Sequence, residues 1–154
     1  MRPLDLHGWA LKFRPEQPDS KSVQGWAKKR GHLVLVVEDD LDMREVERQM
    51  LDFAGYEVLV AGNGREALET LSDQRDQRPS VILLDLMMPV MDGLTFLAER
   101  RRLGLGEDIP VVCVSASGKE MLQQALWLGA KECLQKPPDF DELFDRVEHY
   151  CQAT

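Results

Sequence analysis

Four carboxylates stand directly after two apolar runs, and together they could hold a metal ion. The acidic residues and the runs they follow are Glu38, Asp39 and Asp40 after residues 33–37, and Asp85 after residues 81–84. Such runs are typical of buried parallel strands, and α/β sheets place their chemistry at the carboxyl ends of these strands. If the two strands are neighbours, three or four carboxylates repel one another until a proton or a cation relieves them. Clustered carboxylate oxygens favour a hard divalent cation.

The same pattern has a simpler interpretation. A helix N-cap aspartate also follows a strand and needs no metal. Asp92, in the step Met91-Asp92-Gly93, is better explained as a turn or cap residue than as a ligand. Two acidic clusters in one short chain nevertheless favour a shared pocket over two independent caps.

The elements that must position these residues alternate regularly along the chain. Strand patterns cover residues 33–37, 56–60, 81–84, 110–114 and 132–135, and helical patterns cover about 41–54, 63–73, 93–103, 118–128 and 139–151. Capping pairs are predicted at Asn63 with Glu66, Ser117 with Glu120, and Asp139 with Glu142. Five strand–helix units predict an α/β fold with a parallel sheet covered on both faces.

Composition limits the classes of function. The formal charge of the chain is −8, but residues 1–30 are basic, with seven Lys and Arg against three Asp and Glu. The remaining body is therefore strongly acidic, which argues against direct nucleic-acid binding. No apolar run approaches the length of a membrane span, so a cytoplasmic protein is expected. Three widely spaced cysteines suit reduced thiols.

Four motifs together resemble the receiver domain of two-component response regulators. They are Val36-Val37-Glu38-Asp39-Asp40, the string from Leu84 to Gly93, Val112-Cys113-Val114-Ser115-Ala116, and Lys136-Pro137. The resemblance covers residues 32–154 and leaves residues 1–31 as a basic extension or linker. It implies a flavodoxin-like doubly wound sheet with strand order 2-1-3-4-5 and five helices.

The resemblance also implies a role for each site residue. Asp85 would be the phosphoacceptor, receiving a phosphoryl group from a sensor histidine kinase or a histidine phosphotransfer protein. Lys136 and Ser115 would contact the phosphoryl oxygens, and the Lys136–Pro137 peptide bond would be cis. Mg²⁺ would be held by Glu38, Asp39, Asp85 and the backbone carbonyl of Met87. The protein would act as a signalling switch rather than as an enzyme.

Several positions depart from the common pattern of that family. Cys133 stands where many receivers have an aromatic residue on strand five, so signal coupling is expected to run through Ser115 and helix 118–128. Met87 and Ser117 occupy positions that, in that family, tune the access of water to the acyl phosphate. Trp127 is expected to face outward and to mark a homodimer or output-partner surface on helix 118–128, although a packing role is the alternative.

Two other functions compete with the phosphoacceptor. A receiver-like interaction module could act without phosphorylation, although the complete set of acidic residues and Lys136 argues against it. A phosphate-ester hydrolase would need a second carboxylate two residues after Asp85, where this chain has Met87.

Overall fold

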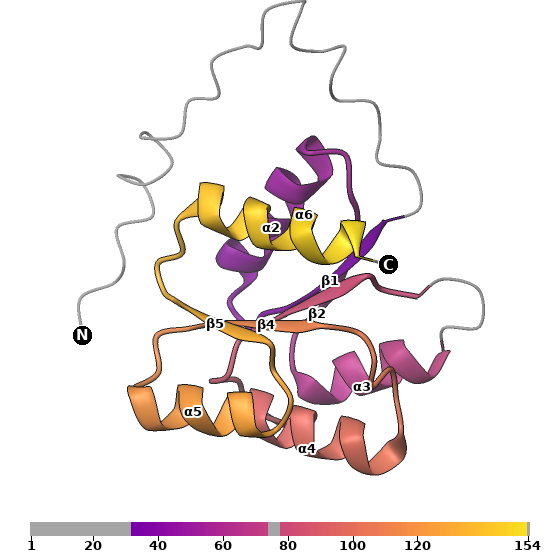
Figure 1. Ribbon diagram of the computed structural model, residues 1–154, viewed down its shortest axis with the longest axis vertical. Coiled ribbons are helices and arrows are strands. Elements are labelled where there is room, and N and C mark those ends of the chain that lie inside the picture. The colour runs from indigo at the N-terminus through magenta and orange to yellow at the C-terminus, as the bar shows by residue number, and fades with distance from the viewer. Residues whose placement is uncertain (1–31, 74–77, 154) are drawn as a thin grey trace, which may run out of the picture.

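A five-stranded parallel sheet in the order β2-β1-β3-β4-β5 lies between two layers of helices (Figure 1). The computed structural model describes residues 32–73 and 78–153, so the predicted extension 1–31 lies outside the described residues. The elements, in chain order, are β1 Leu33–Val37, α2 Leu41–Phe53, β2 Glu57–Ala61, α3 Gly64–Asp73, β3 Val81–Leu84, α4 Gly93–Leu103, β4 Val111–Ser115, α5 Lys119–Trp127, β5 Glu132–Gln135 and α6 Phe140–Gln152.

The strands differ in burial according to their place in the sheet. β1, β3 and β4 are central and every one of their residues is buried, which explains their nearly continuous apolar sequences. β2 and β5 form the edges and contain partly exposed residues. The flavodoxin-like order 2-1-3-4-5 is confirmed, while β2 and β4 each begin one residue later than predicted.

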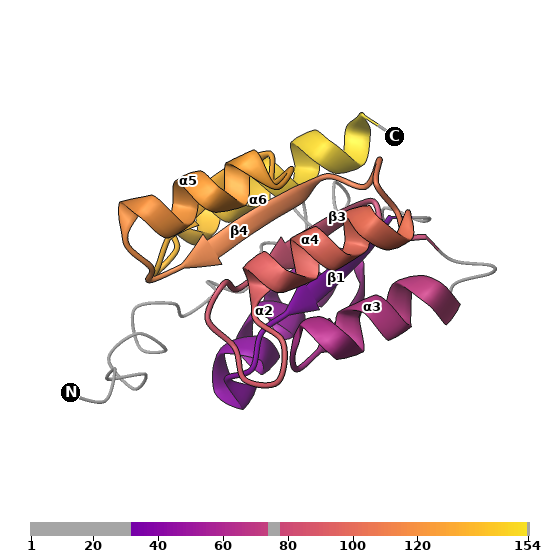
Figure 2. The ribbon, with the colours of Figure 1, turned by 90° about the horizontal axis from the view of Figure 1, so that it is seen from below.

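Two apolar layers hold the helices on the sheet. α2 and α6 cover one face, and α3, α4 and α5 cover the other (Figures 1 and 2). Phe96 and Ile82 belong to the core beneath α4, whereas Leu51 and Val147 belong to the core beneath α2 and α6. Each sheet face therefore has its own core, as expected for a doubly wound fold.

Most helix ends use the predicted caps. Asp139 accepts hydrogen bonds from the first turn of α6, and Asn63 accepts one from the backbone N–H of Glu66. The prediction that Ser117 caps α5 is wrong. Gly118 is the N-cap residue and, as a glycine, has no side chain with which to cap the helix. The Ser117 hydroxyl is instead hydrogen-bonded to Ser115.

In the described part of the chain, no helix is both long enough and apolar enough to cross a membrane.

Candidate functional site

Backbone hydrogen bonds continue the sheet one residue beyond the strand ends and so fix the positions of the candidate site residues. The Glu38 N–H donates to the Ala61 carbonyl, and the Asp85 N–H donates to the Val37 carbonyl, each at 3.0 Å. The Lys136 N–H donates to the Ser115 carbonyl at the same distance. The strand ladder therefore places these residues along the carboxyl edge of the sheet, where the sequence predicted them.

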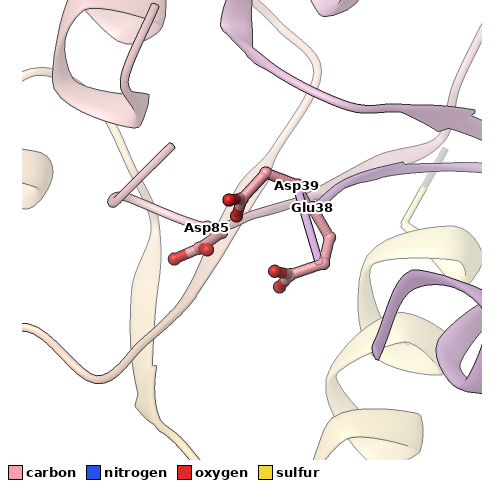
Figure 3. Close-up of side chains that lie close together, drawn as sticks. All are labelled: Glu38, Asp39 and Asp85. Atoms are coloured by element: carbon pink, nitrogen blue, oxygen red, sulfur yellow. The ribbon is translucent and has the colours of Figure 1, made fainter. Parts of the chain in front are cut away.

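Three carboxylates meet at this edge, as Figure 3 shows. Glu38, Asp39 and Asp85 each offer an oxygen, and these oxygens lie within 4.8 Å of one another. Glu38 and Asp85 are buried, whereas Asp39 is exposed. The fourth candidate, Asp40, is not part of the cluster: it is the N-cap of α2 and accepts hydrogen bonds from Asp42 and Met43.

Lys136 provides the positive charge of the site. Its Nζ lies 2.7 Å from Glu38 Oε2 and 3.3 Å from Asp85 Oδ2. Burial opposes its charge, but the hydrogen bonds and attraction from Glu38 and Asp85 raise its pKa. The Lys136–Pro137 peptide bond is cis, as predicted. The ammonium group is thus held charged beside the side chain of Asp85.

One ammonium group does not balance the negative charge of the cluster. Burial raises the pKa of Glu38 to about 7, and the charge of Asp85 adds to this effect while Lys136 opposes it. Burial likewise raises the pKa of Asp85. Negative charge is therefore costly in this pocket, and a cation arriving from solvent would favour the ionised carboxylates.

The donor set fits a hard divalent cation. All three side chains contribute oxygen, which Mg²⁺ prefers, and the exposed Asp39 leaves one side open for retained water. Asp39 and Met87 also line a groove of about 370 Å³ beside this edge. The Met87 N–H donates to Asp85 Oδ1 at 3.2 Å, and the ligand role of the Met87 carbonyl stays a prediction.

Ser115 lies at the end of β4 and is completely buried. Its hydroxyl is 2.7 Å from the hydroxyl of Ser117, and it also accepts a hydrogen bond from the Ser117 N–H. The sequence did not predict this contact. The Ser115 hydroxyl oxygen is therefore already in contact with both the hydroxyl and the N–H of Ser117.

The loop after Asp85 packs closely against the beginning of α4. A Cβ added at Gly93 would lie 2.5 Å from the Asp85 carbonyl oxygen and 2.7 Å from Leu86 Cα. Any larger residue would therefore push α4 away from the acidic residue. Asp92 caps α4 by accepting from the Thr95 N–H, which confirms its interpretation as a cap rather than a ligand.

Glu47 is a further acidic residue that the sequence analysis missed. It lies on α2 with only 3% of its surface exposed, one helical turn before the buried Leu51. Burial raises its pKa to about 8, and the charge of Glu38 adds to the shift. The spacing from Leu51 could have revealed it, because residues four apart share one helix face.

Comparison with known proteins identifies the family. A family model described as the response regulator receiver domain matches residues 34–148. This match covers most of the chain, which therefore belongs to the response regulator receiver domain family. Receiver domains of two-component systems are signalling switches rather than classical enzymes.

Relatives of different lengths share this domain. The chain is 37% identical over 122 residues to the response regulator MprA of Mycolicibacterium vanbaalenii, covering 79% of this chain and 51% of that protein. It is 34% identical over 118 residues to the sporulation initiation phosphotransferase F of Bacillus subtilis, covering 76% of this chain and 91% of that protein. The chain thus spans about half the length of the first relative and nearly all of the second.

A solved structure gives the same result. The receiver domain of the sensor histidine kinase PA1611 from Pseudomonas aeruginosa matches with a TM-score of 0.70 and 28% identity. The match covers 79% of this chain and 98% of that domain, whose structure has a magnesium ion coordinated in the active-site cleft.

Proposed function

We propose that this protein is a phosphoacceptor receiver that is phosphorylated on Asp85 and acts as a switch in a two-component phosphorelay. The observation that carries the proposal is the position of Lys136, whose ammonium group touches both Glu38 and Asp85 at the carboxyl edge of the sheet. We assign residues 32–154 to the receiver domain and residues 1–31 to a basic extension or linker. A cytoplasmic location is part of the proposal.

The proposed reaction begins at the Asp85 carboxylate. One of its oxygens attacks the phosphorus of a phosphohistidine, the P–N bond breaks, and the histidine leaves as imidazole. The Lys136 ammonium group then neutralises charge on the phosphoryl oxygens, and Ser115 donates its hydroxyl to another after leaving Ser117. Little covalent chemistry is needed beyond positioning and charge compensation.

A magnesium ion fits the proposed site. Glu38, Asp39 and Asp85 would hold it with the Met87 carbonyl, and the bound ion would neutralise charge on the transferring group. Glu38 is at present paired with Lys136, so a cation near Glu38 would free the ammonium group to contact phosphate. The three carboxylates would then share the ion instead of repelling one another.

The phosphoryl donor is proposed to be a sensor histidine kinase or a histidine phosphotransfer protein. Apolar side chains close in sequence to the acidic residues support a protein donor, because Leu41, Met87 and Val90 are each more than half exposed. Exposed apolar groups of this size are common where a partner docks. Any output partner or second copy is proposed to bind the α5 face, on which Trp127 is 83% exposed.

Incubation with acetyl phosphate and Mg²⁺, followed by intact mass measurement, tests the proposal. The protein should gain one phosphoryl group, and Asp85→Asn should gain none while keeping the far-ultraviolet circular dichroism of the wild type. Asp92→Asn is the matched control, since asparagine caps a helix as well as aspartate does. It should be labelled normally. Labelling of Asp85→Asn at another residue would overturn the assignment, and no labelling of the wild type would favour the phosphorylation-independent interaction module.

A further inference from the structure

Two cysteines face each other across the last two strands of the sheet. Cys113 on β4 and Cys133 on β5 are directly paired in the strand register. Neighbouring strands lie about 4.8 Å apart, and the Cα atoms of disulfides are usually about 4.4 to 6.8 Å apart. Both side chains belong to the same core layer, so they point to one face of the sheet. The backbone therefore already provides the spacing of a disulfide.

The two thiols differ in accessibility. Cys113 is completely buried. Cys133 is partly exposed and lines a groove of about 800 Å³ together with Leu122 and Leu126 of α5. A small oxidant from solvent therefore meets Cys133 first, while Cys113 lies behind it and is shielded from further oxidation.

Hydrogen bonding also distinguishes the pair. A hydrogen bond between the two thiols lowers the pKa of Cys133 and raises that of Cys113, and burial raises that of Cys113 further. The Cys133 thiol is also 3.6 Å from the Leu122 carbonyl, to which it donates. Because its pKa is the lower of the two, Cys133 is the better nucleophile, since the thiolate is the reactive form.

We propose that Cys113 and Cys133 are a reversible dithiol–disulfide pair that hydrogen peroxide oxidises through Cys133. The Cys133 thiolate attacks one peroxide oxygen, the O–O bond breaks, and a sulfenic acid forms with release of hydroxide. The Cys113 thiol then attacks the sulfur of the sulfenic acid. The S–S bond forms, and the departing hydroxyl takes the thiol proton as water. Two thiols lose two electrons and two protons, and peroxide becomes two water molecules.

The position of the pair connects it with the phosphoacceptor edge. Cys113 lies two residues before Ser115, and Cys133 lies three residues before Lys136. A disulfide would join these strands covalently just before both residues, and it would end the thiol hydrogen bond to Leu122 in α5. Formation of the disulfide does not require that Asp85 accept phosphate, so the two proposals can fail independently.

The experiment compares single cysteine variants after exposure to a small excess of hydrogen peroxide. Cys151 is the matched reference, because it is a residue of α6 and is buried in the core layer on the opposite face of the sheet. Cys151→Ala should lose two hydrogen atoms in mass, regain them with dithiothreitol, and yield one peptide that links residues 113 and 133. Cys133→Ala should form no disulfide. Cys113→Ala should stop at a sulfenic acid on Cys133, trapped as its dimedone adduct.

Other outcomes would overturn the proposal. They are a disulfide that joins two chains, oxygen addition to Cys151→Ala without loss of hydrogen, and an intramolecular disulfide that persists in Cys133→Ala. If Cys113→Ala does not fold, the proposal is tested by the absence of a disulfide in Cys133→Ala and by the linked peptide from Cys151→Ala. Cys133→Ala should still fold, because the partly exposed Cys133 tolerates truncation better than a completely buried residue.

Discussion

Glu47 should make the stability of this domain decrease as the pH rises. Its carboxyl group is buried on α2, and burial with the nearby charge of Glu38 raises its pKa from 4.5 to about 8. A raised folded-state pKa means that the folded protein holds its proton more tightly than the unfolded chain. The stabilisation is therefore complete below pH 4.5 and is lost progressively as the pH approaches 8.

The size of the effect follows from the width of this window. Each pH unit between the two pKa values lowers the free energy of unfolding by about 1.4 kcal/mol, which sets an upper limit of roughly 5 kcal/mol. Relaxation of the helix and entry of water reduce that limit. We expect Glu47→Gln, which cannot ionise, to be more stable than the wild type by about 2 to 4 kcal/mol at pH 8 and nearly equal to it at pH 4.5.

Urea unfolding followed by circular dichroism between pH 4.5 and 8 measures this difference, with EDTA present because a divalent cation would favour ionised carboxylates. Glu45→Gln on the same helix is the control. Glu45 is exposed, and hydrogen bonds from Arg48 and Gln49 lower its pKa to about 2. Its substitution should leave the pH dependence above pH 5 nearly unchanged. If the curves of Glu47→Gln and the wild type are parallel from pH 5 to 8, the reasoning about Glu47 is refuted.

Three further predictions concern the site and the α5 surface. Mg²⁺ at about 100 times its dissociation constant should stabilise the protein by about 2.7 kcal/mol, and Asp39→Ala should remove most of the resulting rise in Tm. Equal melting curves with and without Mg²⁺ would contradict a metal site. Beryllofluoride should change the amide hydrogen exchange of α5, and Ser115→Ala should weaken this change, whereas Cys133→Ala in reducing buffer should leave it nearly unchanged, because only Ser115 gains a partner in the modified state. A large loss of the change in Cys133→Ala would contradict this reasoning. Trp127→Ala should weaken self-association or partner binding by about 1 to 3 kcal/mol without affecting the labelling of Asp85. Sedimentation or titration measures the association constant, and an unchanged value would show that Trp127 has no interface role.

Most of the fold could be predicted from the sequence, because short local patterns, such as continuous apolar runs, identify its strands and helices. The buried runs of β1 and β3 required a covered parallel sheet, and that sheet placed Glu38 and Asp85 on neighbouring strand ends. The site was less predictable where a residue had two possible partners. Ser117 has the spacing of a helix cap, but the buried hydroxyl of Ser115 is its partner. Asp40 follows a strand as a ligand would, yet the free N–H groups of α2 bind it instead.

Glu47 shows a second reason why part of the site could not be predicted from the sequence. A glutamate in an amphipathic helix is normally assigned to the solvent side, because burying an ionised carboxylate is costly. The spacing from Leu51 places Glu47 on the buried face of α2, but the packing of α2 over the sheet is what shows that its carboxyl group lies inside. Its proximity to Glu38 depends on the way the helix returns over β1, which no short sequence motif encodes.

The contact between Lys136 and Glu38 joins residues that are 98 positions apart in the chain. Contacts of such long sequence separation require a large loop to close, which costs conformational entropy. During synthesis, Glu38 and Asp85 can occupy adjacent strands before Lys136 has left the ribosome, and their charges then lack this counter-ion. The ability to accept phosphate would thus arise only when β5 completes the sheet edge. If Asp85 accepts phosphate as proposed, labelling by a small phosphodonor would then report how many molecules in a preparation have finished folding.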